Sequence, residues 1–149
     1  QGLQFLGIKL TMPQRDIYHS QVVQALIQDG WTITDDPLHL SYGGRNLYID
    51  LGAQLPLGAE KNGRKIAVEI KTFRGASDIY ELELSLGQYR LYHHILAEIQ
   101  PDRTLYLAVP AFGYEGIFKE PVGQLVIQRD DLKLIVFDEL QERITQWIR

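Results

Sequence analysis

The stretch that decides the fold is Arg64-Lys65-Ile66-Ala67-Val68-Glu69-Ile70-Lys71. Apolar and polar residues alternate along it, which predicts a β-strand whose successive side chains point to opposite faces. Glu69 and Lys71 are two positions apart and therefore lie side by side on one face. The same face carries Lys65 and the small Ala67, and the other face carries Ile66, Val68 and Ile70. A small residue next to Glu69 favours a face that is partly covered rather than open to solvent.

A second apolar run, Asn46-Leu47-Tyr48-Ile49-Asp50-Leu51, lies upstream of a connection rich in glycine, proline and asparagine. We expect a strand over residues 47–51 that pairs with the first, so that Asp50 joins Glu69 and Lys71 at one sheet edge. Carboxylate oxygens are ligands that Mg²⁺ prefers, and a lysine can orient water or stabilise charge on phosphate. The pattern therefore indicates metal-assisted phosphodiester hydrolysis. The alternative is an ordinary solvated ion pair on a strand, which contributes little to stability.

Composition is that of a globular protein: 149 residues, 45% hydrophobic and 23% charged. No apolar run approaches the roughly 18 residues that a membrane span requires, and no secretory signal is visible. The absence of cysteine excludes disulfides and thiolate metal sites, and it fits a cytoplasmic protein. The chain has four histidines, too few to favour a zinc cage.

The net charge of −4 argues against indiscriminate binding to nucleic acid, but the charge is unevenly distributed. Residues 1–42 carry two bases and four acids, residues 43–94 seven and six, and residues 95–149 six and nine. The segment with the candidate site is therefore the only one that is not negative. We expect its bases to contact phosphate: Arg45, Lys61, Arg64, Lys65, Arg74 and Arg90. Scattered, solvated surface charges are an equal alternative.

Turn and capping signals divide the rest of the chain. Residues 1–11 are expected to be an N-terminal extension outside the fold, and residues 12–149 a single domain. Thr11-Met12-Pro13-Gln14 has the features of a helix start, and Gly30 those of the stop of that helix. Further signals predict strands over 31–34, 38–42, 104–109, 132–137 and 143–148, a long helix over 79–100, and a glycine-interrupted helical segment over 114–128.

The long helix carries a stripe with polar groups, at positions i, i+4, i+7 and i+11: Glu81, Ser85, Gln88 and Tyr92. Apolar residues flank this stripe on both sides, with Leu82, Leu86 and Tyr89 on one side and Leu84, Leu91 and Ile95 on the other. A polar stripe between two apolar ones is expected to be partly buried, so that its groups need partners. A cleft beside Glu69 and Lys71 would supply them. The alternative is a helix with one wide apolar face and a solvated polar strip.

The order of helices and strands, with Asp50 upstream of a Glu-x-Lys strand, resembles the PD-(D/E)xK nuclease superfamily. The resemblance implies an α/β (α+β), restriction-endonuclease-like α-β-β-β-α-β core, with a mixed central sheet and here a C-terminal β-hairpin. It also implies that Asp50 and Glu69 bind Mg²⁺ and that Lys71 orients the attacking water. Gln88-x-x-x-Tyr92 is similar to a substrate-positioning motif of some branches. One departure is Ile49, which precedes Asp50 where the motif has proline.

A closer resemblance runs from Met12 over nearly the whole chain, to the XisH family. It rests on Met12-Pro13, Asp16-Ile17-Tyr18-His19, Asp29-Gly30-Trp31-Thr32-Ile33-Thr34, Ile66-Ala67-Val68-Glu69-Ile70-Lys71, Leu86-Gly87-Gln88-Tyr89, Leu105-Tyr106-Leu107-Ala108-Val109-Pro110 and Leu134-Ile135-Val136-Phe137-Asp138. That family is named for controlling excision of the fdxN element. The resemblance implies a role in site-specific DNA excision beside a separate recombinase and a XisI-like protein. No serine or tyrosine nucleophile in a recognisable recombinase setting is present.

The sequence thus favours a nuclease-like protein that acts on DNA with Mg²⁺ or Mn²⁺. Asp50, Glu69 and the backbone carbonyl of Ile70 are the expected metal ligands, and Lys71 would stabilise the transition state. Asp16, His19 and Glu60 are additional candidates. For His19 a structural role is favoured, because a lone histidine near an apolar helix face is more often structural.

The rival interpretation is a non-catalytic interaction module with a nuclease fold, which regulates a recombinase or a XisI-like partner. The acidic segment 95–149, with its expected hairpin over 132–148, would suit a protein partner better than DNA. The oligomeric state is left open, with a homodimer among the options.

Overall fold

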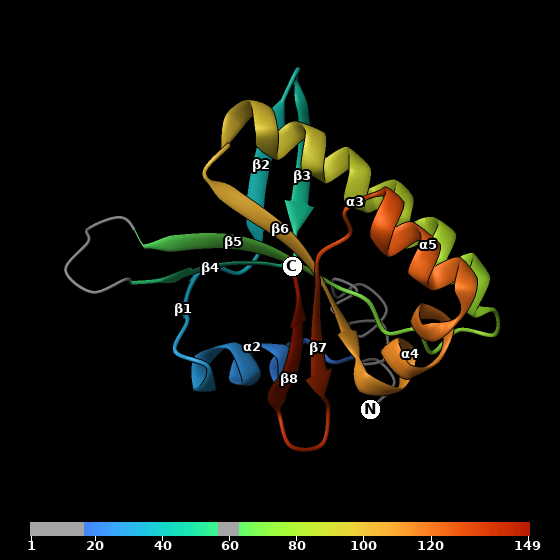
Figure 1. Cartoon of the computed structure of the whole chain (residues 1–149). Coiled ribbons are helices and arrows are strands. Elements are labelled where there is room, and N and C mark those ends of the chain that lie inside the picture. Colours follow the sequence, from blue (N-terminus) through green and yellow to red (C-terminus); the bar gives the residue numbers. More distant parts are fainter. Residues whose placement is uncertain (1–16, 57–62) are drawn as a thin grey trace, which may run out of the picture.

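A computed structural model describes residues 17–56 and 63–149 (Figure 1). The sequence forms two β-sheets with helices packed around the larger one. The elements, in chain order, are α2 (His19–Gln28), β1 (Thr32–Asp35), β2 (Leu38–Tyr42), β3 (Arg45–Ile49), β4 (Leu51–Leu55), β5 (Arg64–Ile70), α3 (Asp78–Ile99), β6 (Arg103–Pro110), α4 (Ala111–Glu115), the 3₁₀ helix η1 (Ile117–Lys119), α5 (Pro121–Arg129), β7 (Leu134–Asp138) and β8 (Arg143–Ile148). No helix among these described residues is long and apolar enough to cross a membrane.

The larger sheet has six strands in the order β1-β4-β5-β6-β7-β8, and it is mixed. β5, β6 and β7 run parallel, whereas β4 pairs antiparallel with β5, and β7 and β8 form an antiparallel hairpin. Helix α3 connects the parallel strands β5 and β6, and the segment from α4 to α5 connects β6 and β7. The predicted mixed α/β class and C-terminal hairpin are confirmed.

The two faces of β5 bury their side chains in different parts of the core. Ile66, Val68 and Ile70 pack with residues of α2, while Ala67 belongs to the cluster that includes the buried face of α3. Figure 1 shows α2 on one side of the sheet and α3, α4 and α5 on the other. The alternation in the sequence therefore predicted the strand and its two faces correctly.

The region around Asp50 differs from the prediction. We expected one strand over residues 47–51 followed by a connection, but two strands flank Asp50. β3 pairs with β2 in a separate two-stranded sheet, and β4 pairs with β1 and β5 in the large sheet. Gly52 lies inside the sheet, where a Cβ would be 2.7 Å from Asp35 Oδ2, so that the Asp35 side chain would have to shift.

Other boundaries shift by smaller amounts. The expected helical segment over 114–128 is three pieces, because the chain breaks at Gly116 and restarts at Pro121, the first residue of α5. Gly30 follows the end of α2 with a φ of +96°, as expected of a helix stop. The expected helix start at Thr11, and the extension over 1–11, lie outside the described residues.

Candidate functional site

The two candidate carboxylates lie next to each other because of the register of the sheet. β4 and β5 are antiparallel with Leu51 opposite Val68, which places the residue before Leu51 beside the residue after Val68. The backbone N–H of Asp50 donates a hydrogen bond to Glu69 Oε1 at 3.3 Å, and that of Ile70 donates to Asp50 Oδ2 at 2.8 Å. Each carboxylate is therefore anchored by the other strand, which fixes both at the end of β5.

Lys71 directly follows β5 and joins this pair of carboxylates. Its backbone N–H continues the sheet by donating to the carbonyl of Ala108 at 2.9 Å. Its Nζ lies 3.5 Å from Glu69 Oε2 and also donates a hydrogen bond to Gln88 Oε1 on α3. The ammonium is thus held between the sheet and the helix, on the face that the sequence predicted.

Negative charge is in excess at this position. Glu69 is 8% exposed, and its burial, together with the neighbouring Asp50, raises its pKa from an ordinary value near 4.5 to about 7 although Lys71 opposes the shift. Burial, then Glu69 and Asp50, raise the pKa of the Tyr92 hydroxyl to about 12. The site therefore contains two carboxylates, one ammonium and a phenol that stays protonated.

The predicted polar stripe of α3 is only partly as expected. Ser85 and Tyr92 are buried, and the Ser85 hydroxyl donates to the carbonyl of Glu81 at 2.7 Å, whereas Gln88 is exposed apart from its bond to Lys71. On the flank formed by Leu84, Leu91 and Ile95, the two leucines are 52% and 51% exposed, whereas Ile95 is buried. The core covers the flank with Leu82 and Tyr89 and reaches only Ile95 of the other flank.

The acidic side chains near Lys71 suit some metal ions better than others. Within residues 17–56 and 63–149, no group of three or more His, Cys, Asp or Glu side chains could hold a metal. A four-ligand zinc site is therefore not formed there. Mg²⁺, however, is typically held by one or two carboxylates together with water and substrate phosphate. The Asp50–Glu69 pair fits Mg²⁺ or Mn²⁺.

The other candidate residues lie apart from these contacts. His19 Nε2 is 2.9 Å from Asp36 Oδ1, so that it links α2 to the turn after β1. Asp16, Glu60 and Lys61 lie outside the described residues.

The candidate phosphate contacts do not gather into one patch. Lys65 pairs with Asp102 at 3.3 Å and Arg90 with Asp130 at 2.7 Å. Arg45 lies at the tip of the β2–β3 hairpin, and Arg74 in the loop before α3.

One residue that positions the site was missed. Phe73 is buried and has a φ of +52°, a left-handed conformation that turns the chain two residues after Lys71. No local signal identifies a phenylalanine in this role, because its position depends on packing against Phe118, 5.2 Å away between ring centroids.

Comparison with known proteins places the chain among relatives. The sequence model of one family, described as XisH protein, matches residues 12–145. The chain belongs to the XisH family. The comparison with curated proteins gave no significant match.

Two solved structures resemble this XisH-family chain closely. A crystal structure of an fdxN element excision controlling factor protein from Anabaena variabilis is 43% identical, with a TM-score of 0.81, and the match covers 91% of this chain and 100% of the other. The crystal structure of an XisH family protein from Nostoc punctiforme PCC 73102 is 41% identical, with a TM-score of 0.80, over 90% of this chain and 100% of the other. The resemblance to the XisH family is thereby confirmed.

Proposed function

We propose that this XisH-family protein takes part in the control of site-specific DNA excision as a divalent-metal-dependent, endonuclease-like protein of the PD-(D/E)xK type. The carrying observation is the arrangement at the end of β5, where Asp50 and Glu69 are locked together by reciprocal backbone hydrogen bonds beside Lys71. Support for the excision role comes from the 43% identical relative, which is named an fdxN element excision controlling factor.

Asp50, Glu69 and the carbonyl of Ile70 would hold Mg²⁺ or Mn²⁺. When bound, such an ion polarises a phosphoryl oxygen and lowers the pKa of a bound water. Burial and mutual repulsion disfavour two ionised carboxylates here, so a bound divalent cation would stabilise the ionised form of the pair. The reaction class is hydrolysis of DNA phosphodiesters.

The remaining residues position and stabilise. Lys71 is close enough to Glu69 to orient a water there and to stabilise charge that builds on phosphate. Gln88 accepts a hydrogen bond from Lys71 and so fixes the direction of the ammonium. The Tyr92 hydroxyl is a hydrogen-bond donor at neutral pH, and its pKa, raised to about 12, keeps it protonated at alkaline pH as well.

A second candidate function is a non-catalytic module that binds a XisI-like protein and regulates a separate recombinase. It is favoured by one specific observation, the pairing of Lys65 and Arg90 with acidic side chains, which leaves these bases less available to phosphate. The excess of acids over bases in residues 95–149 points the same way.

A plasmid-nicking assay with the purified chain in Mg²⁺ or Mn²⁺ separates the two. Under the nuclease proposal the chain nicks DNA, and Asp50→Ala, Glu69→Ala and Lys71→Ala each abolish nicking. Asp102→Ala is the matched control, since it removes a carboxylate from an exposed ion pair outside the site. Nicking that survives in any of the three site variants, or that is absent from the wild type with both metals, contradicts the proposal.

A further inference from the structure

The outer side of α3 carries an apolar stripe that the described part of the chain does not cover. Tyr80, Leu84 and Leu91 are 58%, 52% and 51% exposed, and their spacing of four and seven places them on one side of the helix. The opposite side holds the buried residues Leu82 and Tyr89. Together with Gly87, the stripe follows the four-three spacing of a helix–helix seam.

Gly87 makes no close contact that explains it within residues 17–56 and 63–149. It lies in the interior of a 22-residue helix, where glycine lowers helix stability relative to alanine. A Cβ at this position would meet no atom within 4 Å. The absence of a side chain therefore gives no packing advantage inside the described molecule. It does permit another helix to approach α3 closely at the centre of the stripe.

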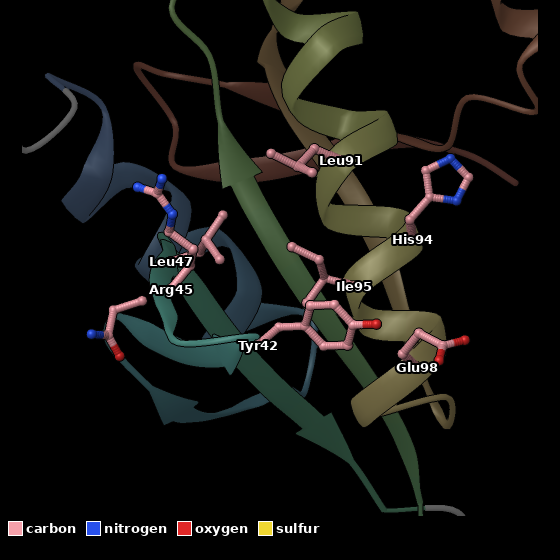
Figure 2. A pocket seen from close by; sticks show the side chains of 8 residues that line it. Tyr42, Arg45, Leu47, Leu91, His94, Ile95 and Glu98 are labelled. Carbon is pink, nitrogen blue, oxygen red and sulfur yellow. The ribbon is translucent and has the colours of Figure 1, made fainter.

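The stripe continues into a cavity. A pocket of about 570 Å³ lies between the β2–β3 hairpin and the C-terminal half of α3, and its lining is largely apolar. Figure 2 shows Tyr42 and Leu47 on the hairpin side and Leu91 and Ile95 on the helix side. Leu91 belongs to both the stripe and the pocket, so that the two form one surface.

We infer that this surface is a homodimer interface, in which α3 of a second copy packs antiparallel against α3 and crosses it near Gly87. Charge complementarity identifies the occupant. Glu83 and Arg90 are seven residues apart and lie on the same flank of the stripe. An antiparallel crossing between them brings Glu83 of each copy opposite Arg90 of the other, which forms two symmetric ion pairs. Arg90 keeps further N–H donors beyond its bond to Asp130.

The same crossing accounts for the pocket. Tyr80 lies seven residues before Gly87, and His94, which lines the pocket, lies seven residues after it. In an antiparallel pair the two positions face each other, so that Tyr80 of each copy reaches the pocket of the other. Its ring can fill apolar space while its hydroxyl stays at the polar rim. This inference does not depend on nuclease activity.

The first test is the oligomeric state of the full chain by light scattering and sedimentation equilibrium. The wild type is expected to be a dimer, and Leu84→Asp is expected to raise the dimer dissociation constant by at least about thirtyfold. Leu125→Asp is the matched control, since Leu125 is also a helical leucine and is 50% exposed, on α5. A monomeric wild type, or equal effects of the two variants, overturns the inference.

The second test maps the crossing point. Because the chain has no cysteine, Gly87→Cys introduces a single thiol near the proposed two-fold axis. Mild oxidation should convert this variant to a covalent dimer, whereas Leu125→Cys should remain uncrosslinked. Glu83→Arg should weaken the dimer, and the double variant Glu83→Arg/Arg90→Glu should restore it. A dimer that Gly87→Cys fails to crosslink overturns the antiparallel arrangement, and circular dichroism of each variant checks that it is folded.

Discussion

Charged side chains lie at both ends of β5, but only at one end are acidic and basic groups balanced. At the N-terminal end, the Arg103 side chain is 11% exposed and donates to the carbonyl of Ile66 at 2.9 Å and to Gln100 Oε1 at 2.8 Å, with Asp35 3.8 Å away. Each of the three guanidinium nitrogens of Arg103 thus faces an acceptor. At the C-terminal end, the neighbouring carboxylates of Asp50 and Glu69 face one ammonium, that of Lys71, which pairs with Glu69.

This difference separates a structural ion pair from a site that can gain by binding a cation. Both ends hold acids and a base near a strand terminus, so residue type alone does not distinguish them. The distinction lies in the ratio of charges and in which groups the backbone already satisfies. The predictions below test whether the two ends respond differently to mutation, pH and metal.

The largest expected effect is at the N-terminal end of β5, where Arg103 lies. Arg103→Met removes the cation near Asp35, whose carboxylate keeps its hydrogen bond from the Thr34 hydroxyl. It also breaks the two hydrogen bonds to the Ile66 carbonyl and to Gln100. Loss of these charge-assisted bonds is expected to cost about 4 kcal/mol of unfolding free energy. Urea unfolding should give the same loss with and without Mg²⁺. Lys65→Met is the control, because its pair with Asp102 is exposed and should cost less than about 1 kcal/mol. A loss that Mg²⁺ repairs would contradict the distinction.

At the other end, stability is expected to depend on pH through Glu69. Its pKa of about 7 in the folded chain exceeds the ordinary value near 4.5, so the folded state binds the proton more tightly than the unfolded state. The stabilisation is therefore present below about pH 4.5 and is lost as the pH rises through about 7, by up to about 3 kcal/mol. In EDTA, the difference between wild type and Glu69→Gln should change over this window. A constant difference would show that Glu69 is not perturbed.

Metal should act on the same end. Mg²⁺ or Mn²⁺ at 100 times its dissociation constant is expected to stabilise the wild type by about 2.7 kcal/mol and to leave Asp50→Asn unchanged in thermal melts. In EDTA, Asp50→Asn should be neutral or stabilising, because the asparagine oxygen can still accept the Ile70 N–H while the repulsion with Glu69 is gone. A variant destabilised by about 3–5 kcal/mol in both buffers would make this end structural as well.

Much of this architecture could be predicted from local patterns, and the failures have a common origin. The alternation over 64–71 gave β5 and both its faces, because side-chain direction in a strand depends only on position. β4 was missed because its pairing with β1 and β5 depends on residues far along the chain. The sequence of α3 offered two apolar flanks and could not indicate that Leu84 and Leu91 of one flank stay exposed while Ile95 meets the core.

The candidate site shows the same limit. Asp50, Glu69 and Lys71 were found because their residue types and spacing suggest chemistry, and the structure brings them together with Gln88. Whether they bind metal stays a prediction. The Arg103–Asp35 pair had no local signal at all, since 68 positions separate its members, and only the folded sheet shows that one end of β5 is satisfied and the other is not.

The smallest expected effect on stability concerns Gln88. It tests whether the C-terminal end of β5, where Lys71 lies, takes part in DNA hydrolysis. Gln88 is exposed and its side chain bonds only to Lys71 among the described residues, so Gln88→Ala should cost less than about 1 kcal/mol. Lys71 would then turn fully toward Glu69, and nicking should fall by more than the stability loss explains. Gln124→Ala provides the control, because Gln124 is likewise exposed and bonds to a backbone carbonyl far along the chain from the site, that of Phe118. If Gln88→Ala destabilises the fold by more than about 1 kcal/mol while nicking is unchanged, the Gln88–Lys71 contact is structural. The two ends of β5 would then differ in charge, but both would serve stability alone.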